Sequence, residues 1–281
     1  NYTASNYLES ANGVNNSAVS AVANAVTRFI AGQFSNTFND RLVYITRDEL
    51  WAAIKKLPDS TGAYGTSLLR TKLNALTQKM AQCVAKYGTQ NNSGSGDKRL
   101  PWATLLSLSN PSYDLSYNDR DGETSGHVPY RVNTSDSATT NNISSPYYLF
   151  ATGSYCYPGP LNDNDLNWYS NWKDHLFYAL SQEFRPDTGS STNSCSGSTC
   201  VKVNSGTRDA AIVMFAGERL AGQARDTPAD RANIANYLEG ANAANHPNSG
   251  GNGNYQSSPA SATFNDLLYC IRDDLSVGLC P

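Results

Sequence analysis

The sequence of 281 residues is poor in charge and has no long apolar segment. Charged residues make up 16% of it, the formal net charge is -3, and no block of five like charges occurs. This composition gives no basic surface for nucleic acid or for an anionic membrane, so we expect neither partner. There is no run of 18 apolar residues, and the N-terminus lacks signal-peptide character. We therefore expect any export or anchoring segment to have been removed upstream of Asn1.

The sequence also lacks the motifs of common enzyme chemistry. It has no GxSxG motif, no GxxxxGK[ST] motif and no strand-borne GxGxxG motif. Its three histidines are predicted to lie apart, with His127 and His246 in loops and His175 on a helix. The 24 acidic residues provide nominal carboxylate pairs for glycoside hydrolysis, but that signal has no specificity. We expect no catalytic residues and interpret the chain as a protein that is not an enzyme.

The six cysteines indicate disulfides rather than free thiols. Two close pairs, Cys195 with Cys200 and Cys270 with Cys280, would leave Cys83 and Cys156 to join each other. Zinc ligation would require CxxC or HxxxH spacing, which these residues do not have. Three disulfides predict an exported protein at the cell surface or outside the cell.

Two motifs recur in the same order along the chain. NYLESAN at 6–12 returns as NYLEGAN at 236–242, and TFNDRLVYITRDEL at 37–50 returns as TFNDLLYCIRDDL at 263–275. Two ordered matches at similar spacing predict an internal repeat. We therefore interpret 1–57 as the C-terminal part of a preceding repeat module and 58–281 as a complete globular module.

Helical patterns occur in three places. The longest covers about 66–88, an amphipathic pattern that Gly88 ends. Thr46 and Glu49 have capping-box spacing and open a second helix that stops before Pro58. A third helix is predicted over 165–183 from a stripe of large apolar side chains.

Strand patterns complete the expected fold. Segments 201–203, 210–216 and the Phe-Asn-Asp-x-Leu part of each repeat copy read as strands, and Trp102 is expected to pack in the core. Long loops are predicted over 112–140 and 242–258. The predicted class is α+β, with a long amphipathic helix packed on a mostly antiparallel sheet and with long disulfide-stapled loops.

A helix that leads into a sheet closed by a C-terminal disulfide resembles the globular part of type IV pilins and pseudopilins. The segments LPWATL at 100–105, VPYRV at 128–132, IVMFAG at 212–217 and LAGQ at 220–223, with the NYLE and TFND elements, are similar to large bacterial prepilin-type proteins. This resemblance covers about 65–281. It implies a pilin-like fold and an extracellular structural subunit of a pilus-like or pseudopilus filament, or a minor surface component of one.

The resemblance also implies partners, namely other pilin-like subunits. The hydrophobic N-terminal helix of pilins, with its cleavage and methylation site, is not in this sequence. We expect a separate helical chain or an upstream segment to supply it. The alternative is a secreted adhesin or carbohydrate-binding module, since 17 tyrosines and four tryptophans would suit a surface or glycan ligand.

Calcium is the best cofactor candidate. Asp119 and Asp121 lie in one polar segment, and Asp163 and Asp165 lie in another, so each segment gathers hard oxygen ligands. Neither segment completes an EF-hand. Asn, Asp and Gly are also the residues that tight turns select, and we favour that interpretation.

Overall fold

The computed structural model describes residues 10–11, 14–15, 45–57, 67–90, 98–106, 117–132, 147–150, 156, 160–187, 194–195, 199–206, 208–246 and 251–281. The chain divides into two compact units, Asn1–Ser67 and Leu68–Pro281. Our expected module boundary, between residues 57 and 58, lies close to this division. The assignment of 1–57 to a preceding repeat module stays a prediction.

Within unit 1, the described elements are β1 (Ser10–Ala11), β2 (Val14–Asn15) and α1 (Arg47–Lys55), and β1 and β2 pair antiparallel. The predicted capping box is present, because the Thr46 hydroxyl accepts from the Glu49 N–H at 3.1 Å and Glu49 Oε2 accepts from the Thr46 N–H at 2.8 Å. The predicted strand in the first repeat copy lies outside the described residues.

Unit 2 begins with α2 (Leu68–Gln90), a helix of 23 residues at the place where the sequence predicts one, although it continues past Gly88, the expected end. The elements that follow it in chain order are β3 (Ser125–His127), β4 (Arg131–Val132), β5 (Tyr147–Tyr148), α3 (Asp163–Trp172), η2 (Lys173–His175), β6 (Leu176–Leu180), η3 (Gln182–Phe184), β7 (Val201–Val203), β8 (Arg208–Asp209), β9 (Ala211–Phe215), α4 (Pro228–Ala232), η4 (Ile234–Asn236), α5 (Gly240–Ala244), β10 (Asn254–Tyr255), β11 (Leu267–Ile271) and β12 (Val277–Leu279).

The main sheet has five strands in the order β12-β11-β9-β6-β3, and every neighbouring pair is antiparallel. All five residues of β6 and all five of β9 are buried, as expected for strands covered on both faces. A smaller sheet, β10-β7-β8, contains the parallel pair β10–β7, and β4 pairs with β5. The predicted strands at 201–203 and 210–216 are therefore confirmed as β7 and β9.

The helix predicted over 165–183 is wrong in its second half. The helix α3 ends at Trp172, η2 follows, and Leu176–Leu180 forms the central strand β6. A short continuous apolar run fits a doubly covered strand as well as a buried helix, so periodicity alone does not separate the two. The predicted loops were also too long, since 112–140 contains β3 and β4, and 242–258 contains the end of α5 and all of β10.

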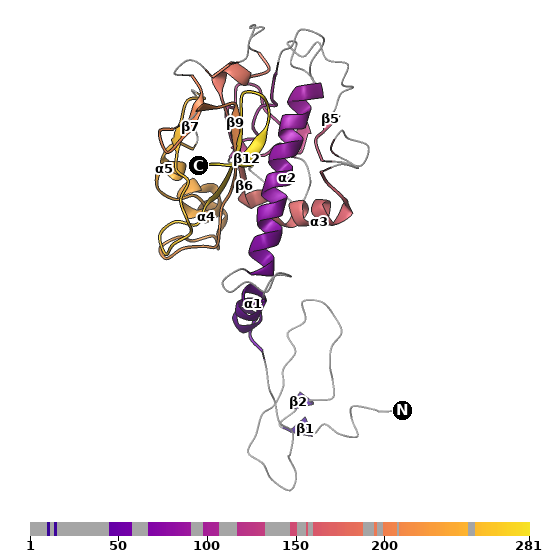
Figure 1. Cartoon of the computed structure of the whole chain (residues 1–281). Coiled ribbons are helices and arrows are strands. Elements are labelled where there is room, and N and C mark those ends of the chain that lie inside the picture. The colour runs from indigo at the N-terminus through magenta and orange to yellow at the C-terminus, as the bar shows by residue number, and fades with distance from the viewer. Residues whose placement is uncertain are drawn as a thin grey trace. The chain divides into compact units, whose positions relative to one another are not determined.

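Alternating side chains divide the core between the two faces of the main sheet. Tyr178, Leu180, Val213 and Ile271 belong to the cluster that contains Leu76, Met80 and Val84 of α2. Their neighbours along the strands join the other cluster, which contains residues of β7, β10 and the segment before α5. Figure 1 shows α2 along one side of the sheet and β7, α4 and α5 on the other. Trp102 is buried on the α2 side, as predicted.

Three disulfides connect parts of unit 2, namely Cys83–Cys156, Cys195–Cys200 and Cys270–Cys280. The first anchors α2, and the last joins β11 to the residue that follows β12. The α+β class with a mostly antiparallel sheet and three disulfides is confirmed. Such bonds indicate an oxidising compartment, extracellular or periplasmic. No helix among the described residues is long and apolar enough to cross a membrane.

Candidate functional site

The two repeated motifs meet in unit 2 through a pair of acidic side chains, Glu239 and Asp266, here called the carboxyl pair. Glu239 belongs to NYLEGAN, and Asp266 belongs to TFND. The Glu239 N–H donates to Asp266 Oδ2 at 3.0 Å, and the Asn265 N–H donates to Glu239 Oε2 at 3.0 Å. Each motif therefore supplies backbone donors for the carboxyl group of the other.

Side-chain amides complete the surroundings of the carboxyl pair. Asn242 Nδ2 donates to Asp266 Oδ2 at 2.9 Å, and Gln223 Nε2 donates to Glu239 Oε1 at 3.0 Å. Asn242 is fully buried, and its Oδ1 accepts from the Gln256 N–H at 2.7 Å. The pair therefore ties the segment after β9, the helix α5 and the start of β11 into one hydrogen-bonded unit.

The carboxyl pair holds a proton at neutral pH. Burial and, second, the negative charge of Glu239 together raise the pKa of Asp266 to about 8. Asp266 is 6% exposed, and its Oδ1 has no hydrogen-bond partner among the described residues. Two adjacent buried carboxyl groups cannot both ionise cheaply, so one of them stays protonated.

Arg225 connects the carboxyl pair to the preceding loop. Its Nε donates to the Asn236 carbonyl at 2.6 Å, and its guanidinium lies 4.6 Å from the centre of the Tyr237 ring. It also donates to the Gly217 carbonyl at 3.3 Å and to Gln223 Oε1 at 3.3 Å. The contacts of Arg225 hold in place the amide that donates to Glu239.

The histidines do not lie apart, as we expected, but gather near Phe177 in β6. His127 stacks on Phe177 with ring centres 4.8 Å apart, and His246 approaches the same ring at 5.5 Å. His175 contacts Tyr237, which in turn contacts Phe177. His127 lies in β3, so its predicted placement in a loop is wrong, whereas His246 follows α5 at a bend, as predicted.

Burial keeps all three imidazole rings neutral. It lowers the pKa of His127 and of His175 to about 4 and that of His246 to about 3. His127 Nδ1 lies 3.2 Å from the Leu176 carbonyl, and His246 Nε2 lies 3.1 Å from the Gly126 carbonyl. A carbonyl only accepts, so these two nitrogens carry the ring proton. Neutral imidazole rings that pack against aromatic side chains are typical of histidines with a structural role in a hydrophobic core.

An ion pair between a buried Lys173 and a partly exposed Asp174 lies beside this aromatic group. Lys173 is 4% exposed, donates to Asp174 at 3.0 Å and lies over the Tyr117 ring at 4.5 Å. Tyr117 also donates to Asp174. Burial raises the pKa of Asp174, but the hydrogen bonds from Tyr117 and Lys173 outweigh it and leave that pKa below its ordinary value. The positive charge of the buried Lys173 ammonium group is thus balanced by the Asp174 carboxylate and the face of the Tyr117 ring.

The calcium candidates fall in two separate places. Asp165 caps α3 through the Asn162 N–H and pairs with Lys79 at 2.7 Å, and Asp163 lies exposed beside it. Asp119 is buried and Asp121 is exposed at a turn. Among the described residues, no group of three or more His, Cys, Asp or Glu side chains is placed to hold a metal ion. Calcium binding stays a prediction, which calcium-dependent melting of the chain tests.

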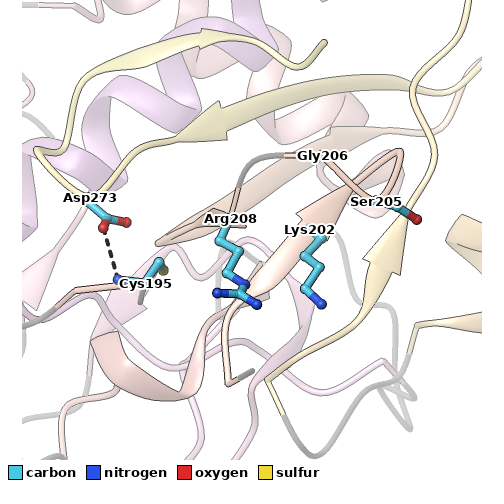
Figure 2. A pocket seen from close by; sticks show the side chains of 6 residues that line it. All are labelled: Cys195, Lys202, Ser205, Gly206, Arg208 and Asp273. Carbon is cyan, nitrogen blue, oxygen red and sulfur yellow. Dashed lines mark hydrogen bonds between the residues drawn. The ribbon is translucent and has the colours of Figure 1, made fainter. Parts of the chain in front are cut away.

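A hollow of about 410 Å³ lies at another place in unit 2. We call it the basic hollow, and its lining residues are Cys195, Lys202, Ser205, Gly206, Arg208 and Asp273. Figure 2 shows Lys202 and Arg208 side by side, with both side chains extending the same way, and Asp273 bonded to the backbone of Cys195.

Sequence reasoning missed the carboxyl pair and the basic hollow. The sequence did contain a signal for the carboxyl pair, because Glu9 and Asp40 occupy the matching positions in the first repeat copy. Glu9 and Asp40 lie outside the described residues. The hollow had no comparable signal, since strand register decides which side chains share it.

Neither the scan against protein-family models nor the searches of curated proteins and of solved structures found a match for this chain.

Proposed function

We propose that this chain is an extracellular structural subunit of a type IV pilus-like or pseudopilus filament, or a minor surface component of one. The observation that carries the proposal is the packing of α2 along one face of an antiparallel sheet whose final strands are joined by Cys270–Cys280. That arrangement agrees with the pilin-like fold that the sequence motifs imply.

The exposure of α2 changes along its length in a way that supports the proposal. Its first two turns contain the exposed residues Leu68, Arg70 and Lys72, whereas Met80, Val84 and other residues of the second half are buried. The first turns thus have little of unit 2 around them. A filament subunit needs such a helix end, where neighbouring subunits or a separate helical chain can pack.

The disulfides fit a protein that must persist outside the cell. Cys270–Cys280 closes a loop with a sequence separation of 10 and fixes the C-terminal end to the sheet. A terminal strand is otherwise a place where a domain frays. Covalent closure removes denatured-state entropy worth about 3 kcal/mol for a loop of this size.

The alternative, an adhesin that uses exposed aromatic side chains, has less support from the described residues. Among the described residues other than Tyr147 and Tyr148, Trp51 is the one exposed Trp, Tyr or Phe side chain, and the rest are buried or half-buried. Tyr113, Tyr155 and Tyr157 lie outside the described residues.

The test is to shear filaments from the surface of cells that make the protein and to identify their subunits by mass spectrometry. The proposal expects peptides from 58–281 in the filament fraction, enriched over the culture supernatant. A chain found as a free monomer that binds a glycan array would select the adhesin instead. Turnover lost on changing one histidine or carboxylate would select a hydrolase.

A further inference from the structure

Most of the exposed large apolar side chains among the described residues lie in one short segment of unit 1. Ile45, Leu50 and Leu57 are 72%, 54% and 49% exposed. Leu50 and Ile54 are four residues apart in α1, and Leu57 follows three residues later, so these three side chains share one side of the helix. We call Ile45, Leu50, Ile54 and Leu57 the α1 face. Neighbouring apolar side chains that are exposed together mark an interaction surface.

The internal repeat shows what covers the corresponding residues in unit 2. When the two copies are aligned at their shared Arg-Asp-x-Leu sequence, Leu50 corresponds to Leu275, and Ile45 corresponds to Ile271. Ile271 is 0% exposed and Leu275 is 7% exposed. Both belong to the core cluster that contains the buried side of α2. Residues that a helix covers in the second copy are therefore exposed in the first.

The contact in unit 2 shows which kind of helix suits these residues. A Cβ added at Gly88 of α2 would lie 3.0 Å from Leu275 Cδ1, so the glycine allows the leucine to approach the helix closely. Met80 and Val84, one and two turns before Gly88, belong to the same cluster as Leu275. The matching helix is thus amphipathic, with an apolar stripe that ends at a small residue.

The two copies continue differently after the shared sequence. Leu275 has a φ of 66°, and the chain turns there into β12, after which Cys280 is joined to Cys270. After Leu50 the helix α1 continues to Lys55 instead. Within the described residues of unit 1, α1 is the only helix. Unit 1 therefore carries the apolar residues of the repeat without a helix of the α2 kind in its described part.

We propose that the α1 face binds an amphipathic α-helix of the same kind as α2, which a partner protein supplies. The partner helix needs a stripe of Leu, Met and Val side chains and a glycine or alanine opposite Leu50, as α2 has Gly88 opposite Leu275. Burial of apolar surface on both sides drives the association, as in other complexes in which a helix lies on an apolar surface. This surface does not depend on filament assembly, so it can fail while the proposed function holds.

The test follows the fluorescence anisotropy of a labelled peptide of the α2 sequence, Leu68–Gln90 with Cys83→Ser, as the full chain is added. We expect saturable binding. Leu50→Gln should weaken it about tenfold, because an amide replaces a side chain that becomes buried, and Leu50→Met should restore most of it. Leu279→Gln is the matched control, since Leu279 is 58% exposed in unit 2, and it should leave binding unchanged.

Two further measurements make the outcome decisive. The melting temperature of each variant shows that it is folded, and a peptide of the same composition in scrambled order should not bind. No saturable binding of the α2 peptide at up to about 1 mM of the chain, or a folded Leu50→Gln variant that binds like the wild type, would overturn the proposal. Self-association of the full chain in sedimentation velocity that Leu50→Gln abolishes would also overturn it, because a second copy would then be the occupant.

Discussion

The protonated carboxyl pair predicts that replacing Asp266 with asparagine removes a specific pH dependence of stability. In the folded chain burial raises the pKa of Asp266 to about 8, whereas its ordinary value is 3.8. The folded state therefore holds one more proton at this residue than the unfolded state between those values. The resulting stabilisation is complete below pH 4 and is lost as the pH rises through about 8.

The magnitude follows from the number of protons. One extra proton in the folded state lowers the free energy of unfolding by about 1.4 kcal/mol for each unit by which the pH rises. The buried histidines have the opposite effect, because their lowered pKa values make stability rise as the pH passes through their ordinary value of 6.5, by about 1 kcal/mol for the three together between pH 6.5 and 7.5. Asp209, whose pKa burial raises to about 6, acts mostly below that interval. Between about pH 6.5 and 7.5 the effects of Asp266 and of the three histidines nearly cancel in the wild type, so the comparison with Asp266→Asn isolates Asp266.

The assay is urea denaturation followed by tryptophan fluorescence at three pH values in this interval and at constant ionic strength. Wild-type stability should change little across it, because Asp266 and the three histidines act in opposite directions, whereas that of Asp266→Asn should rise by about 1 kcal/mol. Asp230→Asn removes a carboxylate that caps α4 and has a lowered pKa, so it should change stability without changing the slope. An Asp266→Asn variant that keeps the wild-type slope would refute the reasoning.

Three other predictions concern packing and covalent closure. Gly217→Ala should lower the free energy of unfolding in urea by about 2 kcal/mol, because the new Cβ would lie 2.7 Å from the backbone oxygen of Asn265. Gly278→Ala is the matched control and should cost much less, because its Cβ would meet no atom within 4 Å. Replacing both Cys83 and Cys156 with alanine should cost about 4 kcal/mol for a sequence separation of 73, and a loss below 1 kcal/mol in urea denaturation would contradict the expected anchoring of α2. Asp165→Asn should lower stability by about 1 kcal/mol through its cap and its ion pair with α2, and an unchanged urea midpoint would count against both contacts.

Local signals predicted the elements that depend on neighbouring residues. The capping box of Thr46 and Glu49 and the buried helix around Met80 could be read from spacing, since each depends on contacts three or four residues apart. The strand Leu176–Leu180 could not, because its state depends on pairing with β9 and β3, which are distant in sequence. A continuous apolar run does not reveal which partner covers it.

The candidate sites likewise combine features that local sequence predicts with features that depend on contacts between distant residues. Glu239 and Asp266 recur in the repeated motifs, but only folding brings them together across 27 residues. The histidine positions were visible in the sequence, but the stacking of His127 on Phe177 follows from the register of β3 and β6, which pair only in the folded chain. The cysteine pairing was predictable because two pairs were close, which left one pairing for Cys83 and Cys156.

The most direct test of the proposed function is immunogold electron microscopy with an antibody raised against residues 58–281. Cells that make the protein are labelled before and after the filaments are sheared from them. The proposal predicts gold particles along surface filaments or at their ends, with the label lost from the cells on shearing. Label spread over the cell surface without filaments, or found in the medium alone, would contradict a pilin-like subunit.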